Sequence, residues 1–232
     1  ITTTVNSVTG VAIPGKFGGT NFTGSLYIGT LPAGTINAAQ ANTAIGQQAL
    51  RSITSGDRNT VLGYGAGYGV TTGANNILIG VDVAEKLTTG GHNTFVGQSS
   101  GYRNETGQQN VAIGSSALFG TAGANINKNI AIGYYSLGNN SADNLVAIGH
   151  QALSANTTGA YNTAVGHESL LVNTIGQKNT AIGYYALKAN TTGVHNTAVG
   201  YSALVANTIG KENVAVGISA LGANTTGNTN TA

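Results

Sequence analysis

Residues 179–195 read NTAIGYYALKANTTGVH, and residues 196–212 read NTAVGYSALVANTIGKE. The Asn-x-x-x-Gly motif that opens both segments returns along most of the chain every 17 residues, apart from one interval of 19 and one of 16. A short fixed period is typical of stacked structural units that each rest on their neighbours. The glycine closing each motif, here named the marker glycine, falls at Gly46, Gly63, Gly80, Gly97, Gly114, Gly133, Gly149, Gly166, Gly183, Gly200 and Gly217.

Each column of the repeat has a physical interpretation. The Asn four residues before the marker glycine stands in ten of eleven units, and its amide can bond to the next rung or stabilise a turn. Before Gly149 this Asn has slipped one place, to Asn144. The Ile or Val directly before the marker glycine, as in Ile182, suits the inward position of a short strand. The marker glycine itself permits a positive φ or a close approach of another backbone.

A Leu recurs four residues after most marker glycines, as at Leu187. With the Ile or Val, it gives each unit two large buried side chains, which contribute about 1.5–3 kcal/mol each. Ordering the backbone costs about 1–2 kcal/mol for each residue, so a single unit cannot fold alone. The expected unit is a strand, a corner, a turn or second short strand, and a glycine corner. The sequence therefore predicts an all-β, repetitive β-solenoid or β-roll whose thin core favours association of several chains.

The repeat also divides the chain. Residues 25–232 form the predicted solenoid domain of about twelve units, with an irregular region around residues 119–143 where a bulged rung or protruding loop is expected. Residues 1–24 fit the repeat poorly and are predicted to form an N-terminal entry or cap segment. The chain begins with Ile1 and ends inside a further repeat, so we expect it to be a piece of a longer protein.

Composition excludes several classes of protein. Only 7% of residues are charged while 41% are hydrophobic, which argues against disorder. The net charge of +2 and the lack of a basic stripe make nucleic acid an unexpected partner. With no Cys, no disulfide framework is possible. No apolar run is long enough to cross a membrane, so no membrane insertion is expected in this segment.

The Asn-x-[AV]-[IV]-Gly strand followed by a second glycine corner resembles the head repeats of YadA-type trimeric autotransporter adhesins. The longer form, N-T-A-[IV]-G-Y-x-A-L-x-x-N-T-T-G, is similar to repeats in bacteriophage tail fibres and related bacterial surface fibres. The resemblance covers about residues 25–232. It implies a parallel homotrimeric fibre, extracellular, on a bacterial cell surface or a phage virion. Nothing in the chain matches an anchor or chaperone segment of these fibres.

The residue after the marker glycine forms an aromatic and imidazole column. Because rungs of a solenoid lie about 4.8 Å apart, these rings are expected to stack. The column is a candidate binding ladder for a sugar or another surface, and the alternative is plain stacking or packing between chains. Its members are Tyr64, Tyr134, His150, His167, Tyr184 and Tyr201.

The chain also carries residues with the chemistry of a metal site and of an active site. His150, His167 and Glu168 have the right chemistry for zinc, but Glu168 follows His167 directly and would point to the other face of a strand. No metal or other cofactor is therefore predicted. The glycine-rich stretch 63–69 looks like a nucleotide loop but lacks the following Lys-Ser/Thr; it is better explained as a rung whose Leu is replaced by Gly67. Enzymatic activity is not expected, because the acids are scattered over different rungs: Asp57, Asp82, Glu85, Glu105, Asp143, Glu168 and Glu212.

The function expected from these features is a structural and adhesive segment of an extracellular trimeric fibre, which presents a multivalent surface to a cell-surface glycan or protein receptor. One alternative is a pure spacer shaft of a phage tail fibre, with binding elsewhere. Another is a monomeric ice-binding solenoid, suggested by the column Thr43, Thr60, Thr94, Thr163, Thr180 and Thr197. That column is interrupted by Val111, Ile130 and Val214, and there is no regular Thr-x-Thr face.

Overall fold

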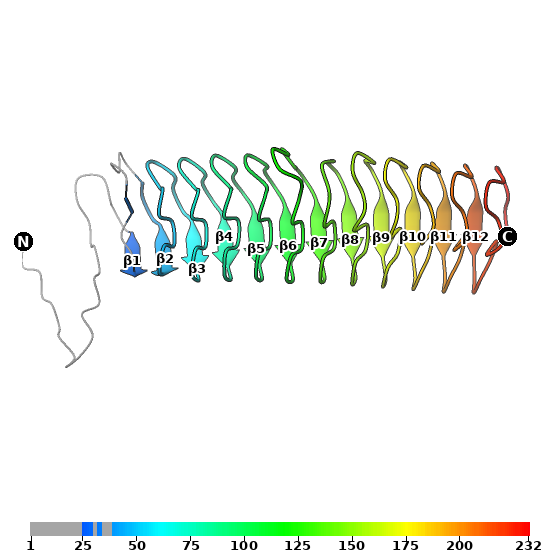
Figure 1. Cartoon of the computed structure of the whole chain (residues 1–232), viewed down its shortest axis with the longest axis horizontal. Helices are drawn as coiled ribbons and strands as arrows, with labels where there is room; N and C mark the ends of the chain where they lie inside the picture. The colour runs from blue at the N-terminus through cyan, green and yellow to red at the C-terminus, as the bar shows by residue number, and fades with distance from the viewer. Residues whose placement is uncertain (1–24, 30–31, 34–38) are drawn as a thin grey trace, which may run out of the picture.

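The chain folds into a straight β-solenoid with one short parallel strand in each rung (Figure 1). The computed structural model describes residues 25–29, 32–33 and 39–232, and these contain no helix. The predicted entry segment, residues 1–24, lies outside the described residues. The prediction of an all-β solenoid with a 17-residue repeat is confirmed for the described part of the chain.

Twelve strands form a single sheet in which each strand pairs only with its neighbours in sequence. In the regular rungs the pairing offset equals the repeat length, so that Thr180 lies beside Thr197 and Ala181 beside Ala198. Like residues therefore stack on like residues along the whole rod. The strands are β1 Leu26–Gly29, β2 Thr43–Gly46, β3 Thr60–Leu62, β4 Ile77–Ile79, β5 Thr94–Val96, β6 Val111–Ile113, β7 Ile130–Ile132, β8 Val146–Ile148, β9 Thr163–Val165, β10 Thr180–Ile182, β11 Thr197–Val199 and β12 Val214–Val216.

The inward residue of each strand is its middle one, and the prediction that the Ile or Val before the marker glycine points inward was wrong. Ala181 is fully buried, whereas Ile182 beside it is 41% exposed. Successive residues of a strand face opposite sides, so placing Ala inside forces Thr180 and Ile182 outside. The small Ala leaves room for a large residue that enters the core from the other side of the rung.

That large residue is the Leu four positions after the marker glycine, whose predicted burial is confirmed. Leu187 is fully buried, and so are its counterparts in most other rungs. Each of these Leu residues has a positive φ, such as 51° at Leu187. A left-handed φ is most costly for β-branched residues, which explains why Leu and not Ile or Val fills this column. The segment around it forms turns and not a second strand.

The strand centre and the Leu column compensate each other in size. Where the strand centre is Phe95, the Leu position of the same rung is Gly101, and a Cβ there would lie 2.5 Å from the Phe95 ring. Gly67, at φ +58°, is likewise a Leu position without a side chain, and a Cβ there would lie 2.8 Å from Leu78 of the next rung. This confirms the interpretation of stretch 63–69 as a modified rung. Protein interiors are close-packed, so a rung accommodates one large side chain and one small one.

The Asn four residues before the marker glycine forms a buried amide ladder, as predicted. Asn196 donates from Nδ2 to Asn179 Oδ1 at 3.1 Å and to the Gly210 carbonyl at 2.8 Å. Its own Oδ1 accepts from the backbone N–H and the Nδ2 of Asn213 at 3.1 and 3.0 Å. Both polar ends of the side chain are satisfied, so each buried amide ties together three rungs. The positive φ belongs to the residue before each Asn, such as His195 at 58°.

A second Asn ladder, which the sequence analysis missed, runs through the C-terminal half. Asn190 donates to Asn173 Oδ1 at 2.8 Å and to the Gly193 carbonyl at 3.1 Å. The same column holds the buried apolar residues Ile53, Val70 and Leu87 in the N-terminal half. This mixture of Asn and aliphatic residues in one column could have revealed the second ladder from the sequence, because it is typical of a position that faces the interior. The members of this second ladder are Asn140, Asn156, Asn173, Asn190, Asn207 and Asn224.

The marker glycines are required for both of the reasons that the sequence suggested. Their φ values lie between 127° and 142° from Gly46 to Gly217. A Cβ on Gly183 would also lie less than 3.0 Å from the backbone of Gly200 in the next rung. The second glycine column, which includes Gly193, has no positive φ but makes the same close approach to the next rung. In the regular rungs both corners therefore exclude a side chain, whereas Ile126 and Ala142 occupy the second corner in the irregular rungs.

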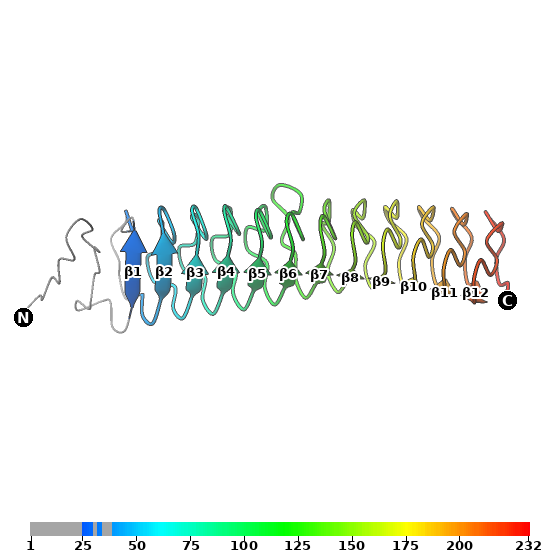
Figure 2. The ribbon, with the colours of Figure 1, turned by 90° about the horizontal axis from the view of Figure 1, so that it is seen from below.

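The two irregular intervals have visible consequences. Between β6 and β7 the 19-residue unit forms a loop that projects from the rod (Figure 2), as expected for residues 119–143. In the following 16-residue unit, Leu145 occupies the first Asn ladder and ends it, because only its backbone N–H donates to Asn129 Oδ1, at 2.8 Å. The ladder starts again at Asn162, which bonds to the carbonyls of Gly159 and Gly176.

Exchange of the two core positions in one rung tests the size compensation. Phe95→Ala is expected to destabilise the chain by about 3–5 kcal/mol because it empties the rung. Gly101→Leu alone is expected to destabilise it because the new side chain meets the ring. The double variant recreates the Ala112/Leu118 rung and should recover most of the loss, which urea unfolding of all four proteins measures as a coupling energy. Additive losses in the double variant would contradict this account.

Removal of one buried amide tests the ladder. Asn196→Ala leaves the buried backbone N–H of Asn213 without its acceptor, and an unsatisfied buried group costs about 1–3 kcal/mol. It also removes one of the two hydrogen bonds at Asn179 Oδ1 and at the Gly210 carbonyl. The urea midpoint should therefore fall clearly. The matched control is Asn139→Ala, which removes an exposed amide bonded only to the Tyr135 hydroxyl and should change stability by less than about 0.5 kcal/mol. Equal effects of the two variants would show that the ladder contributes nothing particular.

Candidate functional site

Five members of the predicted ladder form one continuous stack of rings. The centroids of His150 and His167 lie 4.8 Å apart at an interplanar angle of 10°, and those of His167 and Tyr184 lie 4.9 Å apart at 13°. Tyr134 extends the stack at one end and Tyr201 at the other, at 5.5 and 5.3 Å from their neighbours. The regular rung spacing, together with the turn that follows each marker glycine, holds the rings in register.

Stacking decides which parts of the rings a ligand can reach. The faces of His150, His167 and Tyr184 are covered by neighbouring rings on both sides, so their edges and polar atoms face outward. Only the outer faces of Tyr134 and Tyr201 are free of a stacked neighbour in the column, and these residues are 53% and 54% exposed. The stack therefore presents a row of polar ring edges more than a set of flat apolar platforms.

Tyr64, the sixth predicted member, lies outside this stack. The following rungs carry Val81, Gln98 and Ser115 in the same column, so no ring continues from it toward Tyr134. Its surroundings are different: with Tyr68 it lies beside Asp82 and Glu85 of the next rung. The glycine-rich rung and these two acids belong to different units of the repeat, and the structure brings them together.

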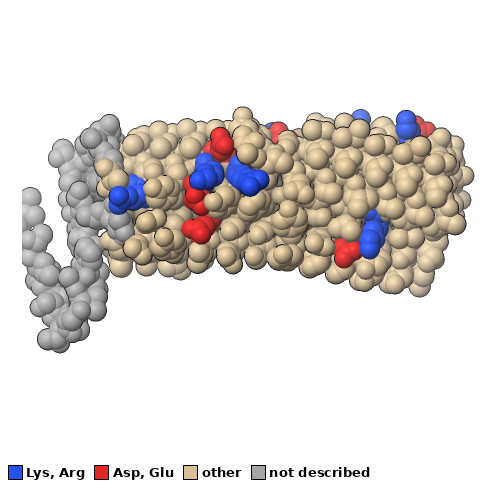
Figure 3. Space-filling view, viewed as in Figure 1, with Lys and Arg blue, Asp and Glu red and all other residues tan. Residues whose placement is uncertain are grey.

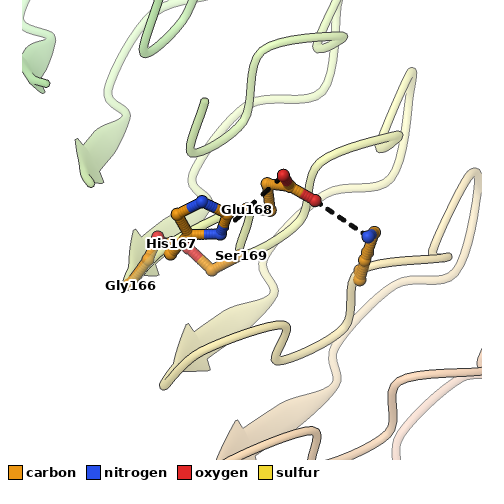
Figure 4. A network of polar contacts seen from close by, with 5 residues as sticks. Gly166, His167, Glu168 and Ser169 are labelled. Atoms are coloured by element: carbon orange, nitrogen blue, oxygen red, sulfur yellow. Dashed lines mark hydrogen bonds and ion pairs between the residues drawn. The ribbon is translucent and has the colours of Figure 1, made fainter. Parts of the chain in front are cut away.

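The residues considered for a metal also meet in space, because donor atoms of His150, His167 and Glu168 all lie within 4.8 Å of one another. Figure 4 shows His167 and Glu168 side by side. The expectation that Glu168 points away from His167 was wrong, because this segment is a turn in which Glu168 has a φ of 52°. His167 Nδ1 lies 3.8 Å from Glu168 Oε1 and has no hydrogen-bond partner among the described residues.

The geometry nevertheless does not fit a zinc site. A metal ion lies in the plane of each imidazole that binds it, at about 2.0–2.1 Å from nitrogen, and two nearly parallel rings at 4.8 Å share no such point. Glu168 is also engaged elsewhere, since its Oε2 lies 2.8 Å from Lys188 Nζ. The cluster is better described as part of the ring stack with an adjoining ion pair.

Charge interactions shift several pKa values here. The hydrogen bond from Lys188 lowers the pKa of Glu168 more than burial raises it, and the nearby Lys188, His167 and His150 charges act in the same downward direction. The same hydrogen bond raises the pKa of Lys188. A hydrogen bond with Tyr185 raises the pKa of Tyr184 to about 12. Lys188 Nζ also lies 3.8 Å from the centroid of the Tyr185 ring, so this part of the surface is held by mutually supporting contacts.

The outward side chains of the strands form a second candidate surface, here named the sheet face. It consists of the first and third residues of strands β2 to β12, and none of the described strands contains a charged residue. Ile113, Ile148, Ile182 and Val216 are each between 36% and 61% exposed. Charged side chains lie in the turns, and Figure 3 shows most of them gathered in one cluster on the N-terminal half of the side in view. Extended apolar surfaces of this kind mark interaction sites.

Comparisons with protein-family models, with curated proteins and with solved structures find no match for this chain. Among the described residues, no helical segment has the length and hydrophobicity that a membrane span needs.

The Glu168–Lys188 pair predicts a pH-dependent contribution to stability. Because the pKa of Glu168 is lowered from 4.5, its contribution is complete above that value and disappears as the pH falls through the lowered pKa. Lys188→Met should therefore reduce the free energy of unfolding at pH 7 by less than about 1 kcal/mol, and by less at pH 3 than at pH 7. The control is Lys178→Met, which removes an exposed lysine. An equal loss at both pH values in urea unfolding would contradict the assignment.

Proposed function

We propose that this chain is a structural and adhesive segment of an extracellular homotrimeric fibre, on a bacterial cell surface or a phage virion. In this role it spaces and stiffens the fibre and presents repeated weak binding sites to a glycan or protein receptor. Three identical chains that each repeat a weak site can raise avidity by about 10²–10⁴. No single strong site is then needed.

The observation that carries this proposal is the sheet face. It is free of charge and largely apolar, and it extends over eleven strands along one side of a straight rod. A typical rung of the single chain buries one Leu and two Ala residues, which is a thin core for 17 residues. Packing of parallel copies against one another through the sheet face would bury a second apolar layer without requiring any charged group to be desolvated.

The stacked rings support the adhesive part of the proposal. Tyr134, His150, His167, Tyr184 and Tyr201 place polar ring edges in one regular row beside the marker glycines. A row of this kind offers hydrogen-bonding groups at a spacing set by the rungs, which suits an extended ligand. The remaining alternative is a spacer shaft, in which the same residues serve only to hold the rungs in register.

Ice binding is a second candidate function because the Thr column projects outward on the same flat face as the Ile and Val column. Thr163, Thr180 and Thr197 occupy three successive rungs in strict register. Other rungs place Ile77, Val111 or Ile130 in this column, so the array is incomplete. Thermal hysteresis of the purified monomer is the measurement that would support this candidate.

The mass of the chain in solution tests the fibre proposal. Light scattering on a sizing column is expected to give three times the 23.1 kDa of one chain. Ile182→Glu, which places a charge on the sheet face, should dissociate the assembly. The matched control is Ile175→Glu, since Ile175 is also exposed, at 51% against 41% for Ile182, but lies in a turn.

A folded wild-type monomer would overturn the trimer proposal, and so would equal dissociation by both variants. If the trimer forms but binds neither cells nor immobilised glycans, the spacer alternative is favoured over the adhesive one.

A further inference from the structure

A groove of about 420 Å³ lies where the glycine-rich rung meets the next one, within the size range of small-molecule sites. It is open to solvent, and two of its lining residues are tyrosines that are 48% and 40% exposed. The groove interrupts a stretch of regular rungs in the N-terminal half of the rod. The lining residues are Gln48, Tyr64, Gly65, Tyr68, Asp82 and Glu85.

Gly65 creates the floor of the groove. Gly65 lies two residues after the marker glycine Gly63. All the other rungs that have a marker glycine carry a side chain at this position, such as Gln48, Ser99 or Glu168. A Cβ at Gly65 would lie less than 3.0 Å from Asp82 Oδ1, so the Asp82 carboxylate occupies the space that this missing side chain leaves. The backbone alone does not require glycine here, since Ser99 has a φ of 53° in the same column and Gly65 a φ of 62°.

The two carboxylates of the groove differ in their availability. Glu85 Oε1 lies 2.7 Å from Lys86 Nζ. Burial raises the pKa of Glu85, but hydrogen bonds from Lys86 and Tyr102 outweigh it and the net shift is downward. Among the described residues, none donates a hydrogen bond to the Asp82 carboxylate, although this residue is half-buried. The Asp82 carboxylate oxygens are therefore available to accept hydrogen bonds from external donors.

The chemistry of the lining selects among ligand classes. Negative charge at Asp82 and Glu85 opposes anions such as uronates and phosphates. A calcium ion takes six to eight oxygen ligands, and here water would supply most of them, because one of the two carboxylates is already paired with Lys86. A small ammonium group is best held between closely spaced rings, and no ring contact joins Tyr64 to Tyr68. A flat ligand with several hydroxyl donors and an apolar face matches the two tyrosines, the Gln48 amide and Asp82.

We propose that this groove binds a neutral saccharide, with Asp82 accepting hydrogen bonds from its hydroxyl groups and Tyr64 and Tyr68 contacting its apolar face. This inference rests on the proposed adhesive function: it names one place on the chain where the ligand attaches and the chemical class of that ligand. It differs in location from the stacked rings, which lie in the C-terminal half of the rod. A trimer would carry three such grooves at one height.

Saturation-transfer difference NMR with the whole chain tests the site, using maltose, lactose and chitobiose as neutral probes and glucuronic acid as the charged one. At least one neutral disaccharide should bind, and glucuronic acid should bind at least fivefold more weakly. Gly65→Ser, which introduces a side chain that other rungs tolerate, should displace the Asp82 carboxylate and weaken binding at least fivefold. Asp82→Ala should do the same without disturbing any described hydrogen bond of that carboxylate.

The matched control is Gln98→Ala, because Gln98 is exposed in the same column as Tyr64 and the next rung places Ser115 and Ser116 beside it, not a carboxylate. Tyr201→Ala tests the alternative site on the stacked rings. Binding that is lost in Tyr201→Ala but kept in Gly65→Ser would place the ligand on the ring stack and overturn the proposal. The proposal would also be overturned if none of the neutral probes bound, or if glucuronic acid bound as strongly as they do. The same holds if Ca²⁺ binds to the chain while none of the sugars does. None of these outcomes depends on the mass in solution, so the groove and the trimer can fail separately.

Discussion

The close approach of backbones at the two glycine corners is the constraint on which this structure depends. At the marker glycines from Gly46 to Gly200 the next rung lies so near that a Cβ has no space, and at the second-corner glycines from Gly56 to Gly210 the same is true without any positive φ. Both contacts fix the length of the path around one rung. Once that length is 17 residues, every other position is forced to stack on its equivalent, and the columns of Asn, Ala and Leu follow. The two deviating intervals show the converse: two added residues leave the rod as a loop, and one lost residue moves Asn144 out of the amide ladder.

Stacking of like on like determines how the interior is filled. A polar side chain can be buried only if its equivalents supply its partners, which the Asn ladders achieve by passing hydrogen bonds from rung to rung. An apolar side chain can be buried only if the rung has room for it. One rung therefore combines the large Phe95 with Gly101, and the next combines the small Ala112 with Leu118. Asn104, at the boundary between the aliphatic and Asn halves of one column, has a buried Nδ2 without a partner among the described residues. The preceding rung has Leu87 in this column, so no Asn Oδ1 is present to accept from Asn104.

The surface follows the same rule, and the two proposals use it in different ways. Where the repeat is regular, it produces continuous rows: the charge-free sheet face for association and the stacked rings for contact with an extended ligand. Where the repeat is broken by Gly65, a hollow forms that the neighbouring rung lines with Asp82 and Glu85. A groove in a repetitive rod requires such a local exception, since identical rungs present an even surface.

The sequence alone determined the period, the parallel stacking of rungs, the Asn ladder, the buried Leu column and the location of the projecting loop. These are consequences of spacing, and spacing is visible in a linear chain. It did not determine which strand residue faces inward, because Ala and Ile both fit a strand and only the Leu entering from the opposite side of the rung decides between them. It also could not place Glu168 beside His167 or Asp82 beneath Gly65, since both depend on the left-handed turns after the marker glycine. Those turns use ordinary residues at positive φ, whose conformation is imposed by the neighbouring rungs and not by local preference.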